Sequence, residues 1–314
     1  MTLPETPDSS HPVPRGRFAP SPTGRMHAGN IYASLVTWLY CKQRGGEVIL
    51  RIEDLDPQRC KPAYAEQIMA DYSMLGLGWD GPIMYQSTRT NVYRDAYNEL
   101  GKRNRIYPCF CTRADLHAAS APHKGEKHVY PGTCRDLSPE EQEARSQLRK
   151  PAWRIQVPER IIRLHDIFQG DYSQQLSEDC GDFLIRRSDG AYAYQLAVVV
   201  DDAAQGVNTV IRGVDLLCST PQQIFLQQEL GFDQPKYGHV PLLVERENRR
   251  LSKRDHDASL EQLLAQYGSA RGVVGHIAHV AGLIPEFEPL TPEELLPRAS
   301  FDSLRNLIQI AWQA

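Results

Sequence analysis

The spacing of apolar residues predicts a helix followed by a buried strand in the first part of the chain. Residues 30–44 carry apolar side chains at a spacing that would place them on one face of a helix. Gly45 and Gly46 are placed to end that helix, and residues 47–52 (EVILRI) have the apolar content of a buried strand. Together with a short extended segment at residues 17–20, this order of strand, loop, helix and strand predicts a βαβ unit of a parallel sheet.

Residues 62–75, which follow this unit, predict another amphipathic helix. A second α/β stretch is indicated later in the chain. Residues 194–200 and 208–211 predict strands, and residues 220–230 predict a helix. After Leu260 the pattern is helical. The sequence therefore predicts an α/β fold in which two separate parts of the chain supply the sheet.

The segment between these two parts differs from both. From about residue 106 to residue 190 it holds a cysteine cluster, a glutamate-rich helical stretch and short strand-like pieces, which is typical of an inserted subdomain. The expected organisation is a flexible tail at 1–14, a parallel-sheet domain in two halves at 15–105 and 191–245, an inserted α+β subdomain at 106–190, and a region with a basic loop and short helices at 246–314.

Composition and charge narrow the class of protein. The chain of 314 residues is 41% hydrophobic and 24% charged, which is the balance of a water-soluble globular protein. It has no apolar run of the roughly 20 residues that a membrane-spanning helix needs, and its N-terminus lacks the regions of a signal peptide. We therefore expect a cytoplasmic protein without a membrane partner. A net charge of −4 argues against non-specific coating of nucleic acid.

Three of the seven cysteines are clustered. Cys109 and Cys111 are followed by Cys134 within a segment that contains glycine and proline. In a reducing compartment such a cluster favours a metal site over disulfides, and zinc prefers four ligands that include thiolates. On general chemistry His128 or His123 would be good donors for the fourth position. The alternative is a set of three thiols without a metal.

The loop between the first strand and its helix would lie at the carboxyl edge of the sheet. Helix N-terminal N–H groups favour anions there, and nucleotide phosphates are the usual ligands. The loop contains Pro20 and Gly24, followed by His27, Gly29 and Asn30. The glycines permit close backbone approach, while the histidine and the asparagine offer hydrogen bonds. In isolation, such a turn more often has only a structural role.

The motifs, taken in their order, resemble those of the class I glutamyl- and glutaminyl-tRNA synthetases. The opening RFAPSPTG with His27 and Gly29 is similar to the first signature of this family, known as HIGH, although Ala28 and Asn30 depart from its literal letters. The resemblance continues through residues 51–56, 199–202, 210–213 and 250–254. The last of these, RLSKR, is a form of the second signature, KMSKS. The resemblance implies a Rossmann-like class I fold with an inserted, zinc-bearing α+β subdomain and a short helical C-terminal region.

The same resemblance implies a site that activates L-glutamate with ATP. The implied glutamate-binding residues are Arg17, Phe18, Ala19, Pro20, Ser21, Glu53, Tyr194 and Arg212. The implied ATP-binding residues are His27, Gly29, Asn30, Arg250, Leu251, Ser252 and Lys253, of which His27, Gly29 and Lys253 would be catalytic. Glutamate needs at least one arginine and one acid in its pocket. Arg17 would meet a carboxylate, Glu53 the α-ammonium, and Lys253 the departing pyrophosphate, with Mg²⁺ expected beside ATP.

Within the family, the chain resembles the short paralogues called glutamyl-queuosine tRNA(Asp) synthetases. Only about 60 residues follow Lys253, too few for an anticodon-binding domain, and the RLSKR loop is shared. The zinc ligands of these paralogues are a Cys-x-Cys pair, a tyrosine and a last cysteine, which points to Tyr130 as the fourth ligand and leaves His128 as the alternative. The resemblance implies a monomer that transfers glutamate to queuosine in the anticodon loop of tRNA(Asp).

Two alternatives stay open at this point. A minimal glutamyl-tRNA synthetase would charge the 3′ end of a tRNA without reading its anticodon, and a non-catalytic relative would act as a binding module. The presence of His27, Glu53, Arg212 and Lys253 favours an enzyme.

Overall fold

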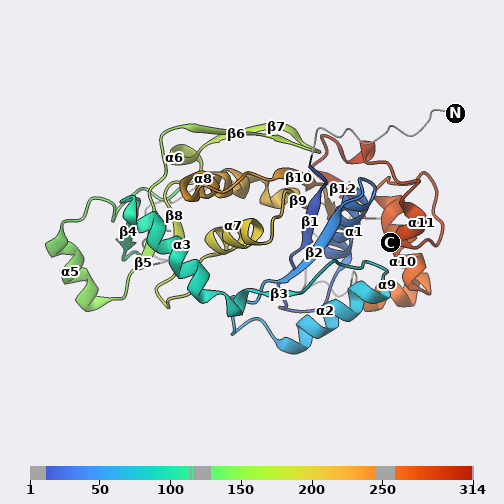
Figure 1. The fold of residues 1–314 in the computed structure, drawn as a ribbon, viewed down its shortest axis with the longest axis horizontal. Helices are drawn as coiled ribbons and strands as arrows, with labels where there is room; N and C mark the ends of the chain where they lie inside the picture. Colours follow the sequence, from blue (N-terminus) through green and yellow to red (C-terminus); the bar gives the residue numbers. More distant parts are fainter. Residues whose placement is uncertain (1–11, 113–114, 116–128, 245–258, 313–314) are drawn as a thin grey trace.

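Parallel strands form the centre of the protein in the computed structural model, which describes residues 12–112, 115, 129–244 and 259–312. One group consists of β1 (Arg15–Phe18), β2 (Glu47–Ile52) and β3 (Met84–Tyr85), which pair in parallel in that order. The other consists of β9 (Thr209–Gly213) and β10 (Lys236–Val240), which also pair in parallel. All five labels lie in the middle of Figure 1.

A backbone hydrogen bond joins these two groups of strands. The N–H of Asn208, just before β9, donates to the carbonyl oxygen of Arg15 in β1 over 3.1 Å. Between β1 and β2 the chain forms α1 (Ala28–Lys42), so the predicted βαβ unit is confirmed. The helix begins two residues before the predicted start because the side chain of His27 caps it.

The helices around the sheet confirm two predictions and correct one. α2 (Pro62–Met74) and α8 (Thr220–Leu230) lie where helices were expected. The strand predicted for residues 194–200 is wrong, because these residues belong to α7 (Tyr194–Ala204). A continuous apolar run does not distinguish a buried helix from a buried strand. α7 contacts both α3 (Thr90–Lys102) and α8, and seven of its residues are buried.

The segment between the two halves of the sheet forms its own small sheet. β4 (Ile106–Cys109), β5 (Ala152–Ile155) and β8 (Phe183–Arg186) pair antiparallel, next to α5 (Pro139–Leu148), at the left end of Figure 1. This agrees with the short strand-like pieces and the glutamate-rich helical stretch expected between residues 106 and 190.

A long hairpin connects this end of the molecule to the central strands. β6 (Ile161–Asp166) and β7 (Gly170–Gln175) pair antiparallel and run along the top of Figure 1 beside α8, and the short α6 (Leu176–Asp179) follows. At the turn of the hairpin, the N–H of Ile167 donates to the carbonyl oxygen of Tyr237 in β10 over 2.8 Å. The end of β6 therefore lies against the central strands.

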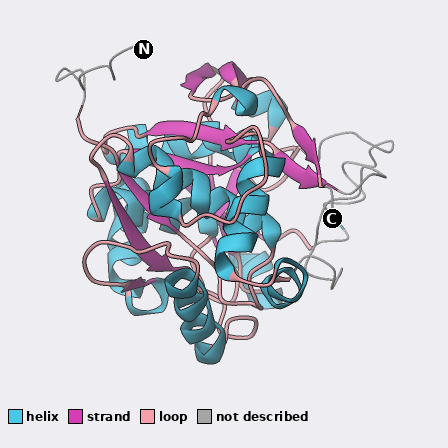
Figure 2. Cartoon of the chain, turned by 90° about the vertical axis from the view of Figure 1, so that its right-hand side faces the viewer, coloured by secondary structure: helices cyan, strands magenta, loops and turns pink. Residues whose placement is uncertain are grey.

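The C-terminal region is helical, as predicted, and adds one strand. It contains α9 (Leu260–Tyr267), α10 (Ala270–Val280) and the short α11 (Pro292–Leu295), on the side of the molecule that faces the viewer in Figure 2. β12 (Gln309–Ala311), which was not predicted, pairs in parallel with β11 (Leu242–Val244). Short 3₁₀ helices complete the described chain at Gln86–Thr88 (η1), Val214–Ser219 (η2) and Asp302–Leu304 (η4).

Two hydrophobic clusters hold these parts together. One packs α1 and the first strands against α10 and the C-terminal region, and the other packs α7, α8 and β9 against the small sheet. In the part of the chain that the structure describes, no helix combines the length and the apolar character needed to span a bilayer.

Candidate active site

A cavity of about 250 Å³ lies where β1, β9 and the first turn of α1 meet. Ten of the residues implied by the sequence line it: Arg17, Phe18, Ala19, Pro20, His27, Gly29, Asn30, Glu53, Tyr194 and Arg212. Its volume is below the range of about 300–1,000 Å³ that is usual for drug-sized ligands, so it suits a ligand of amino-acid size. The fold thus brings together side chains that are far apart in the sequence.

Ser21 is the one described residue of the implied set that does not line this cavity. It lines a neighbouring cavity of about 530 Å³, and Glu53 and Tyr194 line both. These two side chains therefore form part of the wall between the two cavities.

The first turn of α1 lines the cavity with Gly29 and Asn30, and His27 caps it. Nδ1 of His27 accepts a hydrogen bond from the N–H of Gly29 over 3.2 Å, and Oδ1 of Asn30 accepts one from the N–H of His27 over 3.4 Å. A Cβ atom at Gly29 would lie 3.1 Å from Cε1 of His27, so a larger residue would press on the ring. The dipole of α1 favours a bound anion such as phosphate at this end of the helix.

Buried charges of both signs lie in one wall of the cavity and directly behind it. Arg51, which has no solvent exposure, binds Oδ1 of Asp202 over 2.7 Å and Oε1 of Glu53 over 3.2 Å. Nε of Arg17 lies 3.6 Å from the same oxygen of Asp202, and its Nη1 donates to a backbone carbonyl oxygen over 3.2 Å. Burial raises the pKa of Glu53 above its ordinary value, although the guanidinium groups of Arg51 and Arg17 oppose this.

Arg212 differs from these arginines because its partners are neutral. Its Nε donates to Nε2 of His239 over 3.1 Å, and its Nη2 donates to Oγ1 of Thr220 over 2.9 Å. Its Nη1 is buried and has no hydrogen-bond partner among the described residues. A buried guanidinium nitrogen without a partner carries a desolvation cost that a bound carboxylate would remove.

The expected ATP-binding residues Arg250, Leu251, Ser252 and Lys253 lie outside the described residues. Both described flanks of this segment reach the site. Leu243 in β11 lines the cavity, and Ser259, which caps α9, forms an antiparallel bridge with His27.

Four residues in or behind the cavity wall were not assigned a role from the sequence. Arg51 and Asp202 belong to segments that carried the resemblance, while Thr220 and His239 were not singled out. A charged residue within an apolar strand, as Arg51 in EVILRI, is a signal that could have found the first. Asp202 follows the segment that was mistaken for a strand, and a lone histidine such as His239 has no local signal at all.

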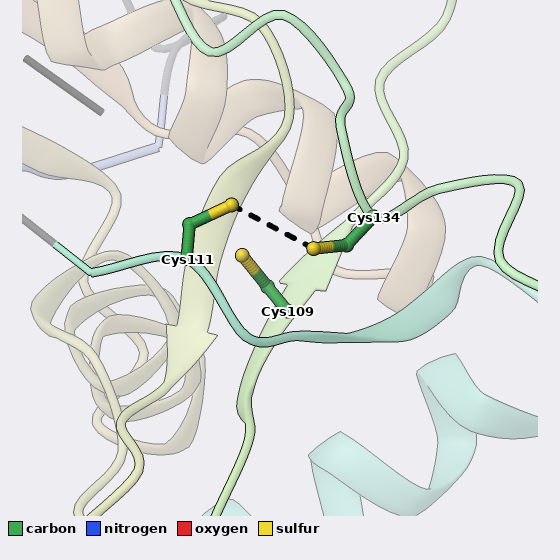
Figure 3. Close-up of side chains that lie close together, drawn as sticks. All are labelled: Cys109, Cys111 and Cys134. Atoms are coloured by element: carbon green, nitrogen blue, oxygen red, sulfur yellow. Dashed lines mark hydrogen bonds between the residues drawn. The ribbon is translucent and has the colours of Figure 1, made fainter. Parts of the chain in front are cut away.

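A second cluster lies in the small sheet, about the sulfur atoms of Cys109, Cys111 and Cys134 (Figure 3). Among the described residues, their ligand atoms all lie within 4.8 Å of one another, and Sγ of Cys111 is 3.6 Å from Sγ of Cys134. Oη of Tyr130 lies 3.5 Å from Sγ of Cys109 and 3.8 Å from Sγ of Cys111. Ligands about 2.3 Å from a tetrahedral zinc ion are separated by roughly 3.8 Å, so this donor set fits zinc.

The surroundings of this cluster favour negative charge on Cys109 and oppose it on Tyr130. Nε of Arg154 donates to Sγ of Cys109 over 3.3 Å, and its guanidinium carbon lies 3.7 Å from the ring centroid of Tyr130. The N–H of Cys134 donates to Oη of Tyr130 over 3.0 Å. Burial raises the pKa of Tyr130, so its deprotonation would need a nearby cation. His123 and His128, the alternative fourth ligands, lie outside the described residues.

Comparison with known proteins places this geometry in a family. Residues 14–284 match the family described as tRNA synthetases class I (E and Q), catalytic domain. The Glutamyl-Q tRNA(Asp) synthetase of Symbiobacterium thermophilum is 47% identical over 296 residues, an alignment that covers 90% of this chain and 91% of that protein. The protein of the same name from Nitratidesulfovibrio vulgaris is 45% identical over 293 residues, with coverage of 89% and 90%.

Solved structures agree with this result. The glutamate-tRNA synthetase from Elizabethkingia anophelis is similar with a TM-score of 0.82 at 26% identity, and the match covers 96% of this chain and 68% of that one. A glutamate tRNA ligase from Elizabethkingia meningosepticum, solved in complex with its amino acid, has a TM-score of 0.80 at 26% identity, with coverage of 96% and 67%. The expected class I synthetase fold is thereby confirmed. The chain belongs to the class I glutamyl and glutaminyl tRNA synthetases and, within them, to the Glutamyl-Q tRNA(Asp) synthetase family of ligases.

Proposed function

We propose that this protein activates L-glutamate with ATP and transfers the glutamate to queuosine in the anticodon loop of tRNA(Asp). The observation that carries the first step is the charge of the cavity. Of the charged side chains that line it, Arg17, Arg212 and Glu53 are buried, whereas Asp215 is exposed. Two buried guanidinium groups and one buried carboxylate complement glutamate, which has two carboxylates and one ammonium.

Each group of glutamate has a chemically suitable partner in this cavity. Arg17 and Arg212 are suited to the two carboxylates, because a guanidinium donates several hydrogen bonds in one plane. The carboxylate of Glu53 is suited to the α-ammonium. Tyr194, on the first turn of α7, lines the same cavity, as do Phe18, Ala19 and Pro20 after β1.

The first step joins glutamate to ATP. An oxygen of the α-carboxylate attacks the α-phosphorus, the bond from that phosphorus to the bridging oxygen breaks, and pyrophosphate leaves. His27, Gly29 and Asn30 would hold the phosphates at the first turn of α1, where the helix dipole favours an anion. Lys253 and its neighbours Arg250, Leu251 and Ser252 would stabilise the charge on the leaving group. Mg²⁺ bound with ATP would neutralise further phosphate charge.

The second step moves glutamate to the nucleoside. A hydroxyl of the cyclopentene-diol of queuosine attacks the carbonyl carbon of glutamyl-adenylate, an ester bond forms, and AMP leaves with the shared electron pair. The support for this acceptor is the name carried by relatives that are 47% and 45% identical to the chain.

A structural zinc ion is also part of the proposal. Cys109, Cys111, Cys134 and Tyr130 would hold it as four ligands. Zinc at this position would connect the end of β4 to the chain before α5 and so fix the small sheet.

The direct test uses radiolabelled glutamate, ATP, Mg²⁺ and tRNA(Asp) with or without queuosine. We expect glutamate to enter the RNA only when ATP and queuosine are both present. As a matched control, the same tRNA(Asp) without its 3′-terminal adenosine should accept glutamate equally well. Uptake that needs the terminal adenosine and not queuosine would reject this acceptor in favour of ordinary tRNA charging.

A further inference from the structure

A buried pair of ionisable side chains lies directly behind Arg212 and has no part in the chemistry described above. Asp166, at the end of β6, and His239, in β10, each have 0% of their side chain exposed. Nδ1 of His239 lies 2.5 Å from Oδ2 of Asp166. Such a pair is costly to bury, so its hydrogen bonds must be nearly complete.

The surroundings of Asp166 keep its carboxyl group ionised. Its Oδ1 accepts hydrogen bonds from the N–H groups of Phe168, Gln169 and His239, each over 3.0 Å. Burial pushes the pKa of Asp166 upward, but the bonds from His239 and Gln169 outweigh this and hold the pKa below its ordinary value. The proton in the contact between Asp166 and His239 therefore belongs to Nδ1 of the imidazole.

This proton fixes the tautomer of His239. With Nδ1 protonated, a neutral ring has its lone pair on Nε2, the atom that faces Nε of Arg212 over 3.1 Å and Oγ1 of Thr220 over 3.1 Å. Burial and the nearby Arg212 hold the pKa of His239 below its ordinary value, although Asp166 opposes them. A charged imidazolium would have no lone pair for Arg212 and would repel it.

Arg212 is thus held at two of its three nitrogens by neutral groups. His239 accepts from Nε, Thr220 accepts from Nη2, and Nη1 is left for a ligand in the cavity. A carboxylate in direct contact with Arg212 would orient the guanidinium equally well but would cancel its charge. The neutral imidazole transmits the orientation, while the negative charge of Asp166 remains one side chain away.

We propose that Asp166 and His239 are positioning residues that set the tautomer of the imidazole and so hold Arg212 oriented and uncompensated for a carboxylate of the substrate. This inference rests on the proposed function, because it takes the ligand of Arg212 to be glutamate. It assigns the pair to glutamate recognition and leaves ATP binding to the first turn of α1.

Two substitutions at the same position separate the two contacts of His239. The amide of asparagine in His239→Asn can still donate to Asp166 but is too short to accept from Arg212. The longer His239→Gln returns an oxygen acceptor near the position of Nε2. We expect His239→Asn to raise the KM for glutamate about tenfold or more in glutamate-dependent ATP–pyrophosphate exchange, and His239→Gln to recover part of the loss. The KM for ATP should change less than twofold in both.

A second pair of variants tests the other anchor of Arg212 and provides the control. Thr220→Val removes the hydroxyl that accepts from Nη2 and should also raise the KM for glutamate. Thr209→Val is a matched change, because Thr209 is buried in β9 and its hydroxyl donates to Asn208, which does not line the cavity. It should leave both KM values unchanged.

A double-mutant cycle distinguishes positioning through Arg212 from general damage. In an Arg212→Ala background, adding His239→Asn should change the KM for glutamate by less than twofold, because the residue that it positions is already gone. An unchanged glutamate KM in His239→Asn and Thr220→Val, or equal rises for glutamate and ATP, would overturn the inference and leave the proposed function intact. Absence of glutamate-dependent exchange in the folded wild-type protein would instead reject the proposed function, and the inference with it.

Discussion

Residues of one type have different roles at this site because their partners differ. Arg15 and Arg17 both belong to β1, two positions apart. Arg15 is about two-fifths exposed and pairs with the exposed Glu47, whereas Arg17 is buried against Asp202 and lines the cavity. An exposed ion pair contributes little to stability because water competes for both partners. A buried guanidinium is screened less by water and therefore attracts a carboxylate more strongly.

Arg17 and Arg15 therefore offer a matched test of glutamate binding. Arg17→Gln should raise the KM for glutamate by roughly 10- to 100-fold, because one charged hydrogen-bond donor is lost to a buried carboxylate. Arg15→Gln should change it less than twofold. Steady-state pyrophosphate exchange at varied glutamate gives both values. Equal effects of the two substitutions would show that Arg17 does not contact the substrate.

His239 should make stability depend on pH in a defined direction. Its pKa is lowered in the fold, chiefly by burial, so the unfolded chain binds the extra proton more readily. The free energy of unfolding should therefore fall as the pH decreases through the ordinary histidine pKa of about 6.5. Urea unfolding at pH 7.5 and pH 5.5 measures this change. It should be smaller in His239→Gln, which has no imidazole to protonate, and an equal change in both proteins would refute the assignment.

At the scale of secondary-structure elements, strong local signals were predictable and long-range burial was not. β2 was placed at its observed limits because EVILRI lies between two glycines and a charged segment. α7 was mistaken for a strand because helices buried on all sides lose their polar face. Even the charged Asp201 of this helix is buried. It accepts hydrogen bonds from side chains that only the fold brings near, namely Gln86, Arg89 and Tyr93.

Removal of a zinc ligand tests how the cysteine cluster stabilises the small sheet, separately from catalysis. Cys134→Ser should lower the zinc content from about one ion per chain towards zero, because a neutral hydroxyl is a much weaker ligand than a thiolate. Amide hydrogen exchange in β4 and β5 should become faster, since the small sheet loses its cross-link.

Two further variants test which side chains bind the zinc ion. Cys218→Ser is the control, because Cys218 is exposed and lies outside the cluster, and it should retain the metal. Tyr130→Phe should weaken zinc binding at least about tenfold if the phenol is the fourth ligand. Full zinc content in Cys134→Ser would contradict a site built on these cysteines.

At the scale of the whole molecule, the cavity forms where two distant parts of the chain meet. β1 brings Arg17, β9 brings Arg212, and the hydrogen bond between Asn208 and Arg15 fixes the two strands beside each other. The resemblance to a known family predicted ten of the residues that line the cavity. It could not predict the supporting side chains, because Asp166 and His239 come from a hairpin and a strand that carry no motif.

Activation of glutamate in this cavity is tested most directly by ATP–pyrophosphate exchange with the folded, zinc-loaded protein and glutamate, glutamine or aspartate as the amino acid. We expect rapid exchange with glutamate and at least about 100-fold less with glutamine, because an uncharged amide leaves a buried arginine without its counter-charge. Aspartate, one methylene shorter, should also be poor. No exchange with glutamate, or equal exchange with glutamine, would contradict the activation of glutamate in this cavity.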